Sequence, residues 1–427
     1  MLDMQRRLTP AFNAIISLPS TAMGFALCIQ ISALSWLLST KYHLDIHEIG
    51  IVWAAGPTAG ILGQVIIGMV SDKVWFWGGR RRPFILIGGA LAALMVFLLP
   101  RIDQVASLLG IGNLLVVAVI VALTLDLSIN IGFNPTRSLI ADVTPEGDAR
   151  TRGFTWMQTI SGFFGVLAYL IGAFIDNYAL ISTGVAIVFA FSVLPMFFVT
   201  EPRDLNVKEE SVAATQTEWG QLWRIYFAHG FAWLGVQSMF VYIIAFIQQH
   251  IIIPGVSPGA YAAQSGHVIA ISFAVMNVVG FLLPALVLAP IARRIGRVRT
   301  QVACMAIMAA AYFAIATMGT TPHRLYALMA VVGIGWSAVV SLPFAIMSEK
   351  VDKSRMGFYM GMFNLSVVLP QLLSTGVGYI MKNAANSNVL FLICGGCLGV
   401  SAALWCLVSE NKAAALAQGA QPLPAAH

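Results

Sequence analysis

The chain has 427 residues, of which 59% are hydrophobic and only 10% are charged, and its mean hydropathy is +0.83. Soluble domains carry about 25% charged residues, so this composition excludes a soluble protein and indicates a chain that lies in a lipid bilayer. The net charge of +6 does not indicate a nucleic-acid partner, because the basic residues form short clusters between apolar segments.

Twelve apolar stretches follow one another along the chain with short polar gaps between them. A spanning helix needs about 20 mainly apolar residues, and each stretch is close to that length. We therefore predict an all-α membrane protein with twelve transmembrane helices and no sizeable domain outside the bilayer. The stretches are residues 17–39, 47–70, 83–100, 112–138, 153–175, 179–200, 222–248, 263–291, 300–318, 324–347, 357–381 and 386–408.

The basic residues predict the orientation of these helices. If the N-terminus is cytoplasmic, the Lys and Arg residues fall on the cytoplasmic side with four exceptions, which are Lys41, Arg101, Arg324 and Lys382. Cytoplasmic loops are enriched in Lys and Arg, so we expect both termini in the cytoplasm. The short loops and the lack of a recognisable targeting segment suit a bacterial inner membrane.

The longest polar segment, residues 201–221, divides the chain near its midpoint. The cluster Gly79–Arg81 after the second stretch is echoed by the basic residues of 291–299 after the eighth. Such parallel repeats predict two six-helix bundles related by a pseudo-two-fold axis. The expected organisation is an N-terminal bundle at 1–200, a cytoplasmic linker at 201–221, a C-terminal bundle at 222–412 and a disordered tail at 413–427, in a protein that acts as a monomer.

Asp126 is the one acid of the 18 acidic residues that falls in the middle of an apolar stretch. A charge at that depth costs a few kcal/mol or more, so such an acid faces the bundle interior or a water-filled cavity and marks a functional site by default. A proton on the carboxyl removes the charge, so proton binding can be linked to the binding of a second ligand. We interpret Asp126 as a proton-coupling residue. The alternative is a hydrogen bond that only joins two helices.

Motifs for other chemistry are missing from the sequence. It holds no GK[ST] loop for a nucleotide phosphate and no HExxH zinc site. Cys394 and Cys397 form a CxxC, but they lie inside an apolar stretch without a further ligand nearby. We therefore expect a transporter that is not an enzyme, binds no metal and uses no cofactor other than a proton as coupling ion.

Several segments of the chain carry longer motifs. The loop at 68–85, with Asp72 and then Gly79, Arg80 and Arg81, is similar to the signature loop of the major facilitator superfamily. The fourth stretch places Asn130 after Asp126 and continues through 135–142, as in plant sucrose transporters and their bacterial relatives. Asn134 and Ser138 replace the Gly and Ala that are usual there. Segments 53–72, 333–346 and 360–371 carry further similarity.

The resemblance implies the major facilitator fold and a proton-coupled symporter of the glycoside-pentoside-hexuronide type. Such a protein would import a disaccharide or glycoside, of the sucrose or maltose class, by alternating access. The Asp72 carboxylate and the Arg side chains near it would hold the cytoplasmic side closed by charge-assisted hydrogen bonds; the alternative is that these charges only set the topology. The gate residues implied are Asp72, Arg80, Arg81, Arg137, Asp142 and Arg152.

Helical spacing separates the two polar residues that follow Asp126. Asn130 lies one turn away on the same face and can hydrogen-bond the carboxyl or a sugar hydroxyl. Arg137 lies roughly 16 Å along the helix, which is too far for a direct ion pair on a straight helix. We expect Arg137 to serve the gate and to pair with Asp142 or Asp72.

Recognition of a sugar requires neutral hydrogen-bonding groups and aromatic faces. The predicted substrate-binding residues are Gln30, Gln64, Asn130, Gln158, Gln237, Tyr242, Trp336, Asn364 and Gln371. Each is also compatible with a contact between helices. Two other functions stay open: a sodium-coupled or uncoupled porter of another small polar solute, and a sensor that binds sugar without moving it.

Overall fold

The computed structural model describes residues 3–57, 59–60, 74–145, 148–201, 217–253, 255–257, 260–348, 350–351, 356–384 and 386–409. Within these ranges ten helices are long and apolar enough to cross a membrane, and a shorter apolar helix follows at Val389–Trp405. The second predicted span begins as α4 (Ile46–Trp53) and runs into residues 61–73, which lie outside the described part. An all-helical membrane fold is thus confirmed, whereas the number twelve stays a prediction.

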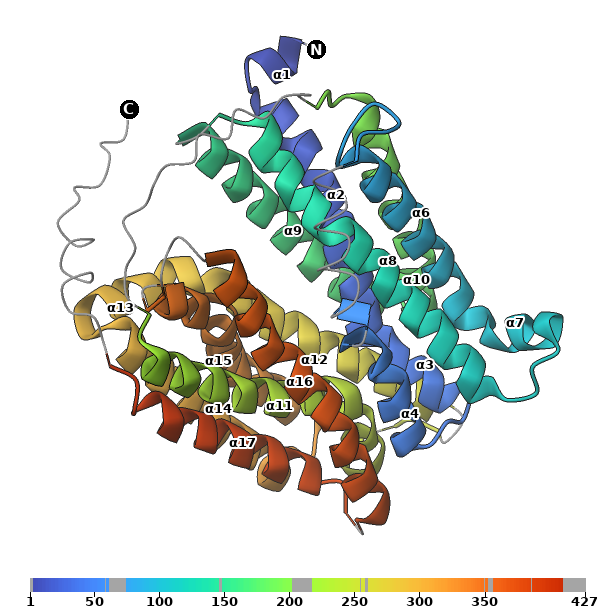
Figure 1. Ribbon diagram of the computed structural model, residues 1–427. Coiled ribbons are helices and arrows are strands. Elements are labelled where there is room, and N and C mark those ends of the chain that lie inside the picture. The colour runs from blue at the N-terminus through green and yellow to red at the C-terminus, as the bar shows by residue number, and fades with distance from the viewer. Residues whose placement is uncertain are drawn as a thin grey trace.

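The helices of the first half pack into one bundle (Figure 1). Its first span is continuous over Pro10–Thr40 and consists of α2, a π-helical segment η1 and α3. The elements of this N-terminal bundle are α1 (Asp3–Arg6), α2 (Pro10–Ile29), η1 (Gln30–Leu34), α3 (Ser35–Thr40), α4 (Ile46–Trp53), α6 (Arg82–Leu98), η2 (Leu99–Arg101), α7 (Ile102–Leu109), α8 (Leu114–Val143), α9 (Asp148–Phe174), α10 (Asn177–Val193) and η3 (Leu194–Phe197).

The second half forms a second bundle below the first in Figure 1. Its longest helix, α11, corresponds to the predicted seventh span. The elements of this C-terminal bundle are α11 (Trp219–His250), α12 (Tyr261–Leu283), η4 (Pro284–Leu288), α13 (Ala289–Ile295), α14 (Arg297–Met318), α15 (Pro322–Ser348), α16 (Met356–Asn383) and α17 (Val389–Trp405).

Capping side chains define where several helices begin. Thr9 accepts a hydrogen bond from the amide of Phe12 before α2, whose first residue is Pro10. Asp45 and Glu48 form a capping box at the start of α4. These caps pair amide groups that would otherwise be left unsatisfied at a helix terminus.

Glycines allow the helices inside each bundle to approach closely. A Cβ on Gly88 of α6 would lie 2.8 Å from the carbonyl oxygen of Ser128 on α8, and one on Gly235 of α11 would lie 3.0 Å from the carbonyl of Cys394 on α17. Helices that cross a bilayer associate through such small residues, because lipid provides little hydrophobic driving force between them.

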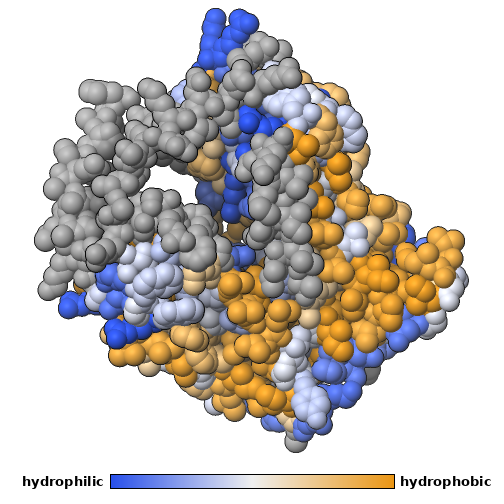
Figure 2. Space-filling model, in the orientation of Figure 1, coloured by the Kyte–Doolittle hydropathy of each residue, from blue (hydrophilic) through white to orange (hydrophobic). Residues whose placement is uncertain are grey.

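The two bundles touch at the end that holds α3 and α4, which we call the closed end. There the Ser35 hydroxyl donates to the Val241 carbonyl at 2.8 Å, and the Trp36 indole donates to the Ala262 carbonyl at 2.6 Å. At the opposite end, where α1 lies, the described parts of the bundles diverge, and we call this the open end (Figure 1). Figure 2 shows a hollow between the bundles with hydrophilic residues deep inside it.

Candidate functional site

Asp126 lies on α8 inside the N-terminal bundle and is only 6% exposed. Its Oδ2 accepts a hydrogen bond of 2.9 Å from Nε2 of Gln30, the first residue of η1. Gly56, directly after α4, forms the opposite wall: a Cβ there would lie 3.0 Å from Oδ2 and 3.2 Å from Cγ of Asp126. Three segments of the bundle therefore enclose one carboxyl.

The carboxyl of Asp126 has no basic partner within the part of the chain that the structure describes, because none of the ion pairs found there includes it. Arg137, on the same helix, places its guanidinium 4.3 Å from the ring centroid of Phe133 instead. This agrees with the helical spacing, which puts Arg137 about three turns away. The acid is thus held by a neutral amide rather than by a cation.

Asn130 is half-buried one turn after Asp126, and its Nδ2 donates to the main-chain carbonyl of Asp126 at 2.8 Å. The side chain also faces Gly60, where a Cβ would lie 4.0 Å from Nδ2. Asn130 therefore stays on the face of α8 that carries the acid, as the spacing predicted, although this hydrogen bond goes to the backbone and not to the carboxyl.

Two of the predicted glutamines meet in the C-terminal bundle. Nε2 of Gln371 on α16 donates to Oε1 of Gln237 on α11 at 3.3 Å. Asn364 lies half-buried one heptad before Gln371 on α16. Gln158 is exposed on α9, while Gln64 lies outside the described residues. Their roles in substrate binding stay predictions.

The two aromatic candidates are packed among helices. The Tyr242 hydroxyl is buried and donates to the Ser374 carbonyl at 3.2 Å, close to the closed end. Trp336 makes edge-to-face contacts with Trp233 and Phe240 of α11, with ring centroids 5.8 and 5.4 Å apart. Only part of the Trp336 indole is left for a ligand.

The predicted gate residues that the structure describes form contacts inside the N-terminal bundle. Nε of Arg81 pairs with Oδ2 of Asp142 at 3.1 Å, and both side chains are nearly buried. In this structure Asp142 is paired with Arg81 from the start of α6, and the pairing of Arg137 with Asp142 or Asp72 stays a prediction. Asp72 lies outside the described residues, and so does the side chain of Arg152.

Glu201 belongs to the same cluster, although the sequence placed it in the linker. Its carboxylate accepts hydrogen bonds of 2.7 to 2.9 Å from the main-chain amides of Arg80, Arg81 and Arg82. It thereby caps the N-terminus of α6, where the helix dipole favours an anion. Because Glu201 lies about 120 residues from these amides, no local pattern could have indicated the contact.

The closed end holds residues that sequence reasoning missed. Ser35 accepts a hydrogen bond of 2.8 Å from the Trp53 indole while it donates to Val241. Nζ of Lys382, at the end of α16, pairs with Oδ2 of Asp45 at 2.7 Å across the two bundles. The contacts from Ser35 to Val241 and from Lys382 to Asp45 join residues more than 200 positions apart, so only the tertiary structure reveals them.

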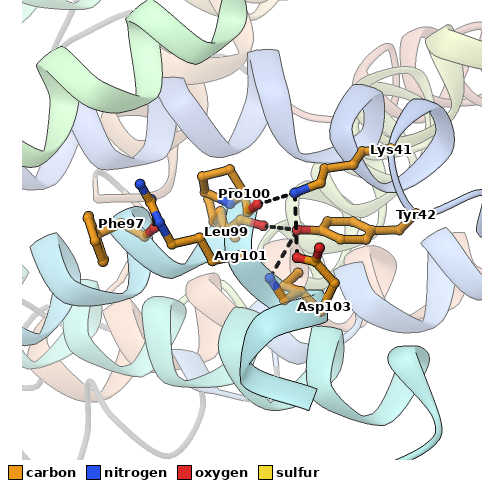
Figure 3. A network of polar contacts seen from close by, with 8 residues as sticks. Lys41, Tyr42, Phe97, Leu99, Pro100, Arg101 and Asp103 are labelled. Atoms are coloured by element: carbon orange, nitrogen blue, oxygen red, sulfur yellow. Dashed lines mark hydrogen bonds and ion pairs between the residues drawn. The ribbon is translucent and has the colours of Figure 1, made fainter. Parts of the chain in front are cut away.

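A polar network anchors the segment between α3 and α4 inside the N-terminal bundle (Figure 3). The Tyr42 hydroxyl donates to the Leu99 carbonyl and accepts from the Ile102 amide, both at 2.9 Å. Lys41 donates to the Pro100 carbonyl and lies 3.4 Å from Asp103. Burial raises the pKa of Tyr42 above its ordinary value, so its hydroxyl keeps the proton that it donates.

Two helical bundles that meet at one end and diverge at the other, with a buried acid inside the first bundle, are the arrangement of a membrane transport protein rather than of an enzyme. The profile of the Major Facilitator Superfamily matches residues 16–375, and the chain belongs to this family. Solved structures agree on the fold: the D-xylose-proton symporter superposes with a TM-score of 0.70 at 15% identity over 94% of this chain and 98% of that one. A nucleoside transporter, NupG, gives 0.72 at 14% identity over 93% and 100%.

Curated relatives match a smaller part of the chain. The general alpha-glucoside permease of Schizosaccharomyces pombe is 30% identical over 174 residues, which cover 36% of this chain and 31% of the permease. Sucrose transport protein SUC4 of Arabidopsis thaliana is 28% identical over 184 residues, covering 38% of this chain and 33% of that protein. The similarity thus spans about a third of the length of these relatives.

Proposed function

We propose that this protein is a symporter that imports a disaccharide or related glycoside, of the sucrose or maltose class, together with a proton. The observation that carries the proposal is the Asp126 carboxyl, buried inside the N-terminal bundle and hydrogen-bonded to Gln30. An ionisable group at that depth is costly and is retained where it moves a proton or binds a ligand.

The arrangement of the bundles supports alternating access. Contacts such as Ser35 to Val241 hold the closed end together while the bundles diverge at the open end. A transporter moves its substrate by exchanging such closures between the two ends. In our proposal twelve spans cross a bacterial inner membrane, the break between the bundles lies at residues 201–221 and both termini are cytoplasmic, so the structure corresponds to the inward-facing state.

The names of the relatives support the substrate class. The permease of S. pombe is described as acting on alpha-glucosides, and the plant relatives are described as sucrose transport proteins. The neutral pair Gln237 and Gln371, which the structure brings together, supplies amide donors and acceptors of the kind that sugar hydroxyls require.

Uptake into proteoliposomes tests this proposal. Labelled sucrose and maltose are offered with an inward proton gradient, an inward sodium gradient or no gradient, with unlabelled trehalose and monosaccharides as competitors. We expect accumulation only with the proton gradient and competition by disaccharides. Accumulation driven by the sodium gradient would show that sodium, and not the proton, is the coupling ion. Binding without uptake would indicate a sensor.

A further inference from the structure

The site at Asp126 and the closed end are joined by one short piece of helix. Seven consecutive residues, from Gln30 to Trp36, include the partner of Asp126 at one end and two contacts to the C-terminal bundle at the other. Five of them, Gln30–Leu34, form the π-helical segment η1 between α2 and α3. Single π-helical turns inside α-helices are rare and frequently occur at functional sites.

A π-helical turn carries a different register from the α-helix on either side of it. Its hydrogen bonds run from residue i to i+5 rather than i+4, so conversion to α-helix rotates and shifts the residues that follow the turn in the chain. The backbone groups stay paired in both forms, as they must in a bilayer. Such a segment can therefore change the position of Ser35 and Trp36 without exposing unpaired amides to lipid.

The chain after α3 limits which residues a change in the register of η1 can move. The Tyr42 hydroxyl is hydrogen-bonded to the Leu99 carbonyl of the same bundle (Figure 3) and to the Ile102 amide. A change in the register of η1 is therefore confined between the Asp126 contact and Tyr42. The residues within that interval include Ser35 and Trp36, which contact the other bundle.

Ser32, inside η1, is in an unusual environment. Its hydroxyl is buried, with the residue 1% exposed, and it has no hydrogen-bond partner in the described part of the chain. Buried hydroxyls on helices normally donate to a carbonyl of the preceding turn. An unpaired hydroxyl makes the present register more costly, and a change of register would bring a different carbonyl into its reach.

We propose that η1 transmits the state of the Asp126 carboxyl to the closed end, with Gln30 as the positioning residue that links them. This rests on the coupling role proposed above for Asp126. The bond from Gln30 to an ionised carboxylate is charge-assisted and holds η1 in the π register. When a proton or the substrate takes over the carboxyl, Gln30 is released, η1 returns to α-helix, and Ser35 and Trp36 withdraw from Val241 and Ala262.

Distances across the closed end test the proposal. Spin labels at Ser107→Cys on α7 and Ile252→Cys after α11, both exposed positions, report its opening in a background with the exposed thiol Cys406 replaced by Ser. Gln30→Ala should raise the ratio of open to closed distances by about tenfold, because it removes a hydrogen bond to a charged group. Gln104→Ala on α7 is the matched control and should leave the ratio unchanged.

Two further variants separate transmission from simple loss of packing. If Gln30 acts through Asp126, Gln30→Ala should add nothing in an Asp126→Asn background, whereas a merely structural role would give additive shifts. Ser32→Ala should shift the ratio severalfold the other way, toward the closed distances, because it removes the unpaired hydroxyl. Unchanged distances in Gln30→Ala, additive shifts, or opening in Ser32→Ala would each overturn the proposal.

Failure of this inference is distinguishable from failure of the proposed function. If Asp126→Asn loses proton-driven accumulation while Gln30→Ala leaves the distances of the wild type, the acid couples the proton without η1. If Asp126→Asn accumulates sugar normally, the coupling role itself fails. Should Gln30→Ala prove unstable in detergent, Gln30→Asn, whose amide is one methylene short of Asp126, takes its place.

Discussion

The hydroxyl of Tyr242 on α11 occupies the space where a side chain on Gly50 of α4 would begin. The same oxygen lies 2.5 Å from the position of a Cβ on Gly378 of α16 and donates to the Ser374 carbonyl. One tyrosine of the C-terminal bundle therefore fits between two glycines from different bundles. This contact forms only while the two bundles meet at the closed end, so substitutions at these residues should change the population of the closed state.

Gly50→Ala should open the closed end, because the new methyl group overlaps the Tyr242 hydroxyl. Overpacking of this kind costs about 1–3 kcal/mol, which shifts the open-to-closed ratio by roughly tenfold. Tyr242→Phe removes the overlapping oxygen, so the double variant should recover most of the closed population. Spin-label distances across the closed end provide the measurement, and a double variant no better than Gly50→Ala would contradict the contact.

Gly56→Ala should impair coupling at Asp126, because its Cβ would press on the carboxyl at 3.0 to 3.2 Å. We expect at least a tenfold loss of proton-driven accumulation with little change in sugar exchange. Gly60→Ala is the matched control, since among the described residues its Cβ meets only Asn130, at an ordinary 4.0 Å. Equal effects of the two substitutions would show that the tight wall around Asp126 is unimportant.

The ion pair between Asp45 and Lys382 predicts a pH dependence of the closed end. Burial acts to raise the pKa of Asp45, but its hydrogen bonds to Lys382 and to the amides of Glu48 and His47 outweigh this and lower the pKa below its ordinary value. A lowered carboxyl pKa contributes stability that is present above the ordinary pKa and is lost as pH falls through the lowered one.

The closed end should therefore loosen only at strongly acidic pH. Both side chains are about half exposed, so the effect should stay below roughly fivefold in the distance ratio. Lys382→Met should loosen the closed end at neutral pH and flatten the acid dependence. An unchanged acid dependence in that variant would assign it to a different group.

The Arg81 and Asp142 pair should be important for stability. Both side chains are nearly buried, and removal of one partner leaves the other charge without compensation, at a cost of about 3–5 kcal/mol. Asp142→Asn should therefore lower the thermal unfolding temperature strongly, whereas Asp103→Asn, which affects an exposed pair, should barely change it. If both variants unfold at the same temperature as the wild type, the buried pair contributes little.

Much of the fold could be predicted because bilayer helices are encoded locally. The apolar stretch at 112–138 became α8 (Leu114–Val143), and the stretch at 222–248 became α11 (Trp219–His250). Asp126 could be singled out because a charge inside an apolar stretch is costly whatever surrounds it. Such signals depend on neighbouring residues, so a single sequence carries them.

The surroundings of Asp126 could not be predicted in the same way. The bond from Gln30 joins residues 96 positions apart, and the role of Gly56 as a wall depends on how α4 meets α8. Glu201 belongs to the polar segment that predicts a linker, and its amide partners at the start of α6 lie about 120 residues away, so no local pattern indicates the contact. The amino-acid composition of Gln30–Leu34 does not indicate a π-helical turn, since tertiary packing rather than helix propensity determines it.

The most direct measurement of the central claim is sugar transport by Asp126→Asn in proteoliposomes, with accumulation under a proton gradient compared with exchange between equal sugar concentrations. We expect accumulation to disappear while exchange persists, because a side chain that cannot titrate still allows the bundles to alternate but not to carry a proton. Accumulation at the rate and extent of the wild type would contradict the coupling role of Asp126.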